Sequence, residues 1–257
     1  MPEPTAPHFI LLRGLTRESA HWGDFVPQLQ AAFPNARLTL LDLPGAGLFF
    51  RDTSPASIRG ILEKVRMQAL EQDSLSEPAV LIAVSLGGMV AWEWMLTHPQ
   101  EIGGGILINT SLGSLSPFYR RLRWQNYGRL FAAAGNRDVE KREPALLELL
   151  SNHKENYPKI AADWIAIQKA RPVGAGTAFR QLTAAATYCP EAIKPKPPIL
   201  LLNSRGDQLV DPQCSEAIAR KWQLELHTHS WGGHDLTVDD SRWVVAEIRA
   251  WIKNAAY

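Results

Sequence analysis

Ser85, Asp207 and His234 are the three residues whose types and positions in this chain predict nucleophilic chemistry. Each of them follows a short apolar run of the kind that forms a buried strand. A serine hydroxyl is a weak nucleophile until a base removes its proton, and an imidazole has a pKa suited to that task. A carboxylate then holds the imidazole in one tautomer and stabilises the charged ring. The three residue types therefore predict a triad for acyl transfer.

Ser85 lies at the junction of two sequence patterns. Residues 79–84 form a continuous apolar run, and a helical spacing of apolar residues begins after the serine. Ala83 and Gly87 are small residues two positions before and after Ser85, which is the pattern of the sharp strand-to-helix turn called a nucleophile elbow. Taken alone, the same five residues equally fit a serine that caps a helix N-terminus.

Two backbone N–H groups are expected to stabilise the negative charge that develops on the substrate oxygen. The first belongs to Leu86, which opens a helix whose N-terminus favours negative charge. The second is assigned to Leu15, in the loop after the first predicted strand. Three aromatic residues are predicted to contact substrate, with core packing as the alternative role of each: Trp22, Phe118 and Trp231.

The acid of the triad has two rivals in the sequence. Asp42 follows the second predicted strand, within a run of turn-forming residues. Asp211 precedes Pro212, which indicates the start of a helix. Asp207, which follows the fifth predicted strand, is the predicted partner of His234, and Asp42 and Asp211 stay open as alternatives.

Six short apolar runs alternate with amphipathic helical patterns. This alternation predicts a doubly wound α/β fold with a mostly parallel six-stranded sheet that is covered on both faces. The carboxyl ends of parallel strands share one edge of such a sheet, and ligands bind there. The serine, the acid and the histidine are thus expected to meet at that edge. The expected strands are residues 8–13, 36–41, 79–84, 104–108, 198–202 and 224–228.

Residues 112–190 interrupt this alternation, because they contain helical patterns and no convincing strand. About eighty residues are too many for an ordinary connection between two strands. We therefore predict an inserted all-helical cap over residues 112–190, with residues 1–111 and 191–257 as the core. The expected cap helices are residues 118–134, 139–151, 157–170 and 177–187.

The predicted cap is basic. It has 12 basic and 6 acidic residues, a net charge of +6, whereas the remainder of the chain has a net charge of −5. A basic surface of this kind is either an ordinary solvated face or a site that attracts an anionic substrate or an acidic partner.

Composition limits the other function classes. With 257 residues and 46% hydrophobic content, the chain can bury a large core. A formal charge of +1 gives no indication of a nucleic-acid or membrane partner. Cys189 and Cys214 have no metal-ligand spacing, so neither a metal site nor a disulfide framework is expected, and a cytoplasmic location is favoured. The N-terminus shows no signal-peptide pattern, and its apolar run, residues 9–12, is too short to cross a membrane.

Five segments of the chain follow a known pattern: ILLRG, LDLPGAG, AVSLGG, NSRGDQLVDP and WGGHD. In these segments the chain resembles the α/β-hydrolase family, especially small bacterial carboxylesterases of the pimeloyl-acyl-carrier-protein methyl ester esterase type. The resemblance implies that the acid is Asp207, in a GD-x-x-V context, and that the base is His234, in a G-H segment. Two positions depart from the family, since Arg13 replaces a more frequent histidine and Ala83 replaces a glycine.

Taken together, these patterns predict hydrolysis of a small carboxylic ester through an acyl-serine intermediate, without a metal or organic cofactor. A thioesterase, an amidase or an acyltransferase uses the same residues and stays open. A second hypothesis is a methyl ester esterase whose substrate is delivered by an acidic acyl carrier protein at the basic cap. A third is a ligand-binding signalling module that retains the triad without turnover.

Overall fold

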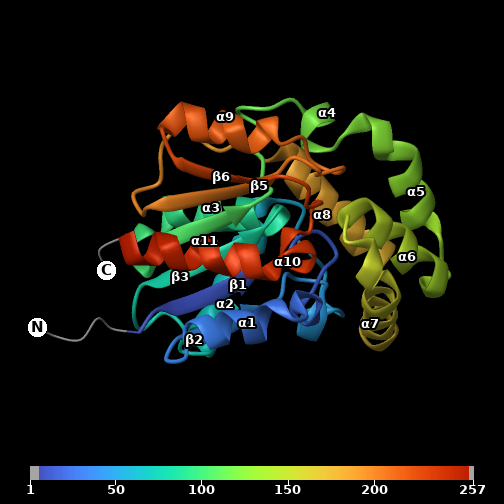
Figure 1. The fold of residues 1–257 in the computed structure, drawn as a ribbon, viewed down its shortest axis with the longest axis horizontal. Helices are drawn as coiled ribbons and strands as arrows, with labels where there is room; N and C mark the ends of the chain where they lie inside the picture. The colour runs from blue at the N-terminus through green and yellow to red at the C-terminus, as the bar shows by residue number, and fades with distance from the viewer. Residues whose placement is uncertain (1–5, 255–257) are drawn as a thin grey trace, which may run out of the picture.

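The computed structural model describes residues 6–254, and its centre is a six-stranded sheet in the order β2-β1-β3-β4-β5-β6 (Figure 1). All five strand pairings are parallel. The strands are β1 (His8–Leu12), β2 (Arg37–Leu41), β3 (Ala79–Val84), β4 (Ile102–Ile108), β5 (Ile199–Ser204) and β6 (Glu225–His229). The predicted doubly wound parallel sheet is confirmed.

Strand residues alternate between two hydrophobic cores, one on each face of the sheet. Phe9 and Leu11 of β1 belong to the core beneath α1 and α11, whereas Ile10 and Leu12 belong to the core beneath α2, α3 and α9. Figure 1 shows α1 and α11 in front of the sheet. The bounds are α1 (Phe25–Ala32), α2 (Ile58–Glu71), α3 (Leu86–Thr97), α9 (Gln213–Trp222) and α11 (Ser241–Asn254).

The order of the strands sets the place of the site. The chain leaves β1 for β2 on one side and then passes to β3 on the other side of β1. The topological switch of the sheet is therefore at the carboxyl ends of β1 and β3, where a crevice for ligands opens. Ser85 directly follows β3.

Between β4 and β5 the chain forms helices and no strand, and these helices gather at one end of the sheet, on the right in Figure 1. We call them the cap helices: α4 (Phe118–Arg121), α5 (Tyr127–Gly135), α6 (Val139–Leu150), α7 (Tyr157–Ala170) and α8 (Ala175–Thr187). The division of the chain into a core and a cap domain stays a prediction. The remaining helical turns are η1 (Ser19–Trp22), η2 (Gly47–Phe49), η3 (Pro99–Glu101), η4 (Trp124–Asn126), η5 (Lys154–Asn156) and α10 (Leu236–Asp239).

The prediction of one helix over residues 118–134 is wrong, because the segment is broken into α4, η4 and α5. Leu122 and Arg123 are extended at the break. The Arg123 N–H donates to the Leu209 carbonyl at 2.8 Å, and its guanidinium donates to the Asp207 carbonyl at 2.7 Å. Contacts with a loop far away in the sequence therefore interrupt a segment whose own pattern is helical.

Among the helices of residues 6–254, none combines the length and the apolar character that crossing a lipid bilayer requires. The longest, such as α2 and α7, have 14 residues, and both carry charged side chains. A transmembrane helix needs about 20 mostly apolar residues.

Candidate active site

Ser85 occupies a strained backbone conformation between β3 and α3. Its φ of 55° and ψ of −115° lie where a residue with a side chain is rarely found. The strain is held by two backbone hydrogen bonds, from the Ser85 N–H to the Ile108 carbonyl at 2.8 Å and from the Gly88 N–H to the Ser85 carbonyl at 2.9 Å. This is the geometry of a nucleophile elbow, and it does not fit the alternative of a simple helix cap.

Two glycines allow the elbow to approach β1. A Cβ atom on Gly87 would lie 2.6 Å from the carbonyl oxygens of Leu12 and Arg13, so any side chain there would collide with backbone. A Cβ atom on Gly14 would lie 3.3 Å from the Ser85 Cβ atom. The loop after β1 therefore passes directly beside the serine.

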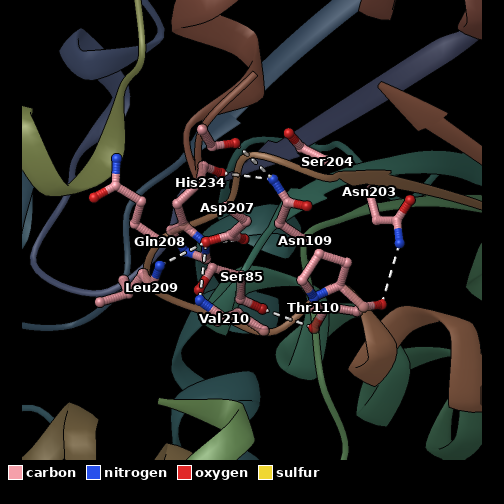
Figure 2. Close-up of polar contacts among 12 residues, drawn as sticks. Ser85, Asn109, Thr110, Asn203, Ser204, Asp207, Gln208, Leu209, Val210 and His234 are labelled. Atoms are coloured by element: carbon pink, nitrogen blue, oxygen red, sulfur yellow. Dashed lines mark hydrogen bonds and ion pairs between the residues drawn. The ribbon is translucent and has the colours of Figure 1, made fainter. Parts of the chain in front are cut away.

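His234 and Asp207 form a buried pair next to Ser85 (Figure 2). The His234 Nδ1 atom lies 2.7 Å from Asp207 Oδ2, and the two side chains are 5% and 1% exposed. A carboxylate only accepts hydrogen bonds, so Nδ1 carries the proton and Nε2 is left with a free lone pair. That nitrogen can accept a proton from a hydroxyl group.

Asp207 is fixed by the loop that carries it, residues 205–212, which we call the acid loop. Its Oδ1 atom accepts the Leu209 N–H at 2.8 Å and the Val210 N–H at 2.9 Å. The two rival acids have other roles, since Asp42 accepts from Ser19 and Leu48, and Asp211 accepts from the Gln213 N–H at the start of α9. Of the three, Asp207 is the one bonded to His234.

His234 lies in the loop after β6, residues 230–235, which we call the histidine loop. The Asn109 side chain, at the carboxyl end of β4, donates to the Gly233 carbonyl at 3.2 Å and to the His234 carbonyl at 2.9 Å (Figure 2). Asn109 is fully buried and has a positive φ of 49°. The sequence reasoning missed it, although a polar residue directly after an apolar strand is a signal that points to this edge.

A small cavity of about 70 Å³ contains the candidate site. Ser85, His234 and Leu15 all line it, and Leu86 opens α3 next to the serine. Its other walls are mostly apolar and come from the core and from the cap helices α5 and α6. They include Val84, Leu130, Leu146, Leu150 and Leu209.

The structure does not bring the three predicted substrate-binding aromatics into this cavity. Trp22 is buried beneath the Arg13 guanidinium, which lies 4.7 Å from its ring centre. Phe118 is exposed on α4, with its ring 6.5 Å from that of Tyr127. Trp231 packs against His229 and lines a separate, larger cleft of about 760 Å³, together with Trp22 and residues of α7 and α10. An aromatic residue type alone does not indicate whether the side chain will line this cavity, because that depends on the path of the loop that carries it.

Arg13, the main departure from the family pattern, is bound to the residue after the histidine. Its guanidinium forms a fully buried ion pair with Asp235 and donates to the Thr237 hydroxyl at 3.1 Å. Burial disfavours the charged carboxylate, but the Arg13 charge and the hydrogen bonds from Arg13 and Thr237 outweigh burial and lower the pKa of Asp235. Arg13 thereby holds the histidine loop at the residue that follows His234.

We expect the change Asp235→Ala to lower the free energy of unfolding by about 3–5 kcal/mol, because it leaves the Arg13 charge buried and unpaired. The paired change Arg13→Met with Asp235→Leu should recover most of that loss. Urea unfolding at neutral pH measures both. Because folding lowers the pKa of Asp235, its contribution is complete above the ordinary carboxyl pKa and is lost as the pH falls through the lowered value. A single variant as stable as the wild type would contradict this role.

The other titratable groups near the site are not alternative nucleophiles or bases. The His21 Nδ1 atom accepts the Glu18 N–H at 3.1 Å, and its Nε2 atom lies 3.4 Å from the Arg17 guanidinium. Burial, together with the charges of Arg17, Arg13 and Arg171, holds the pKa of His21 well below its usual value, which makes its ring a weak base. Burial raises the pKa of the Cys214 thiol to about 11, so a thiolate is disfavoured. Within residues 6–254, no group of three or more histidine, cysteine, aspartate or glutamate side chains is arranged to hold a metal ion.

Comparison with known proteins gives one family and several named relatives. The model of the alpha/beta hydrolase family matches residues 9–247. A pimeloyl-acyl-carrier-protein methyl ester esterase of Edwardsiella ictaluri is 39% identical over 102 residues, which are 40% of this chain and 36% of that protein. Its counterpart of the same name in Aeromonas salmonicida is 27% identical over 221 residues, 82% of this chain and 81% of the relative. The crystal structure of an esterase from Rhodococcus sp. ECU1013 has a TM-score of 0.75 at 18% identity, with 96% and 90% of the two chains covered, which is a likeness of fold.

Proposed function

Because the chain belongs to the alpha/beta hydrolase family, we propose that it is a serine hydrolase that cleaves carboxylic esters through an acyl-serine intermediate. Ser85 is the nucleophile, His234 the general base and acid, and Asp207 the group that orients the imidazole. The observation that carries this proposal is the buried 2.7 Å contact between His234 and Asp207 beside a serine in a strained elbow. A strained backbone conformation costs free energy, and a serine with only a structural role would gain nothing from it.

In the proposed reaction, the Ser85 hydroxyl attacks the ester carbonyl carbon while His234 Nε2 takes its proton. The carbonyl electrons move to the oxygen, which accepts hydrogen bonds from the Leu15 and Leu86 N–H groups. Collapse of this intermediate expels the alcohol, which receives the proton from His234 and leaves an acyl group on Ser85. A water molecule then gives a proton to His234 and attacks the acyl carbon, after which Ser85 regains that proton and the acid is released.

The size of the cavity favours a short acyl group. The cavity of about 70 Å³ is lined by leucine and valine side chains and is far smaller than the roughly 300–1,000 Å³ of a typical site for a drug-sized ligand, which favours a short acyl group. We expect kcat/KM for p-nitrophenyl acetate and butyrate to exceed that for the octanoate by at least about tenfold. A chain-length series of p-nitrophenyl esters measures this. The change Leu146→Ala, which widens the cavity, should move the optimum to longer chains.

The same assay tests the function itself. A fluorophosphonate should stop turnover and add its mass to the peptide that contains Ser85, because such reagents react with an activated serine hydroxyl. A wild-type protein that hydrolyses no ester or thioester and stays unlabelled would overturn the proposal. It would favour the alternative of a ligand-binding signalling module without turnover.

A second candidate is a methyl ester esterase, or a thioesterase or acyltransferase, whose acyl group is carried by an acidic acyl carrier protein. Two relatives are named for a methyl ester of this kind, and the cap helices are rich in arginine and lysine. Arg120 of α4 and Arg180 of α8 are exposed, and so is Arg137 between α5 and α6. This candidate requires a kcat/KM for a carrier-bound ester that falls steeply with added salt, whereas turnover of p-nitrophenyl acetate should not depend on salt.

We also propose a cytoplasmic location and the division into a core and a cap. The location is supported by Cys189 and Cys214, which are both free thiols. The division is supported by the run of helices between β4 and β5.

A further inference from the structure

Asn152 is a cap residue whose carboxamide reaches both loops of the candidate site. It lies two residues after the end of α6, and Ser151 caps that helix. Its Nδ2 atom donates to the Gly206 carbonyl at 3.0 Å and to the Trp231 carbonyl at 2.8 Å. Its Oδ1 atom accepts the Gln208 side-chain amide at 3.0 Å. An asparagine amide has two N–H donors and one carbonyl oxygen, so each of these groups has a partner.

The three partners of Asn152 belong to the loops that carry Asp207 and His234. Gly206 and Gln208 are the residues immediately before and after Asp207, and Trp231 belongs to the histidine loop. In Figure 2 the Gln208 side chain turns away from His234, toward the neighbouring cap segment. One side chain therefore holds the acid on both sides and joins its loop to the loop of the base.

The backbone around Asn152 holds the histidine loop as well. The Asp235 N–H donates to the Leu150 carbonyl at 2.7 Å. The Asn152 N–H donates to the Asp239 carboxylate at 3.0 Å, and the same carboxylate accepts the Gly233 N–H at 2.5 Å. Asp239 is 4% exposed. Gly233 and Asp235 are the two neighbours of His234, so this segment fixes the histidine from both sides.

We propose that Asn152 is a positioning residue, which acts from the cap through Gly206, Gln208 and Trp231 to hold Asp207 and His234 in the geometry that proton transfer needs. This inference rests on the proposed function of the triad. A displacement of about 1 Å in a reacting group can lower the rate by about 10²-fold. The Asp207–His234 contact is a single hydrogen bond between two loops, so its geometry depends on what joins those loops.

The test is the change Asn152→Ala, with Asn156→Ala as the matched control. Asn156 is an exposed asparagine at the end of η5, four residues later in the same cap segment. We expect Asn152→Ala to lower kcat for p-nitrophenyl acetate by about 10–100-fold with little change in KM, and the control to match the wild type. The second readout is the far-downfield proton resonance of the His234 Nδ1–H bonded to Asp207, which should broaden or move only in Asn152→Ala.

The outcomes separate a positioning role from a structural one. An unchanged kcat overturns the proposal, and so does a lower kcat with the Nδ1–H resonance intact. If Asn152→Ala does not fold, Gln208→Ala removes one of the three hydrogen bonds and should give a smaller loss of kcat with the same spectral change. Turnover and fluorophosphonate labelling of the wild type are measured in parallel. A wild type without either would refute the proposed function, whereas an active wild type with an equally active Asn152→Ala would refute this inference alone.

Discussion

Replacing Ser85 with alanine is expected to lower kcat for p-nitrophenyl acetate by about 10⁶-fold, the scale of losing the nucleophile of a triad. The elbow presents this hydroxyl at the switch point of the sheet, in the cavity that it shares with His234. No acyl-enzyme can form without it, so only direct attack by water on the bound ester remains. Alanine fits the strained φ of 55° no worse than serine does, and the fold should persist.

The measurement compares steady-state turnover and thermal unfolding of Ser85→Ala with those of Ser114→Ala, a change at an exposed serine outside the site. We expect equal stability and a loss of activity in the first variant only. Turnover that survives in Ser85→Ala at more than a small fraction of the wild-type rate would mean that another group forms the acyl bond, and the assignment of the nucleophile would be wrong.

The sheet and the placement of the candidate site were predictable from sequence because each depends on local signals. Buried parallel strands such as Ala79–Val84 are short continuous apolar runs, and all six residues of this strand are buried. The residues that follow such strands necessarily meet at one edge, which is where Ser85, Asp207 and His234 lie. The turn around Ser85 also had a local signature, because only small residues fit beside it.

The remaining parts of the site were not predictable because they depend on contacts between distant segments. The break after Arg121 exists because Arg123 binds the acid loop, more than eighty residues later. Asn152 has no local pattern that distinguishes it from the other asparagines of the cap. The positions of Trp22 and Trp231 were not predictable for a similar reason, since both line a different cleft that forms only when distant segments pack together.

These distant contacts follow one pattern, in which the part of the chain between β4 and β5 holds each loop of the site. The loop after β1, which carries Leu15, is bound through the Thr16 N–H to the Gln181 side chain of α8 at 2.9 Å. In the same loop, Arg17 forms a buried ion pair of 2.6 Å with Glu143 of α6. The acid loop is bound by Arg123, and the histidine loop is bound by the segment after α6. The segment between β4 and β5 is therefore a part of the scaffold of the site as well as a wall of its cavity.

The change Asp207→Asn is expected to lower kcat by about 10⁴-fold while the fold stays intact. The asparagine Oδ1 atom can keep the two hydrogen bonds from the Leu209 and Val210 N–H groups. Its Nδ2 group then faces His234 Nδ1 and donates to it. The imidazole must accept there, so its proton moves to Nε2, the nitrogen that has to take the Ser85 proton. The site keeps its shape and loses its base.

The matched control is Asp211→Asn, four residues away in the same loop, where the side chain accepts the Gln213 N–H at the start of α9 and an amide oxygen serves equally well. Turnover of p-nitrophenyl acetate and the position of the His234 ring proton in NMR spectra are measured for both variants. We expect a large loss of kcat and an altered ring proton in Asp207→Asn alone. If instead the control lost activity and Asp207→Asn kept it, Asp211 would be the acid. Because the tautomer of His234 follows from one carboxylate oxygen, this single atom decides whether the buried pair can act as a base.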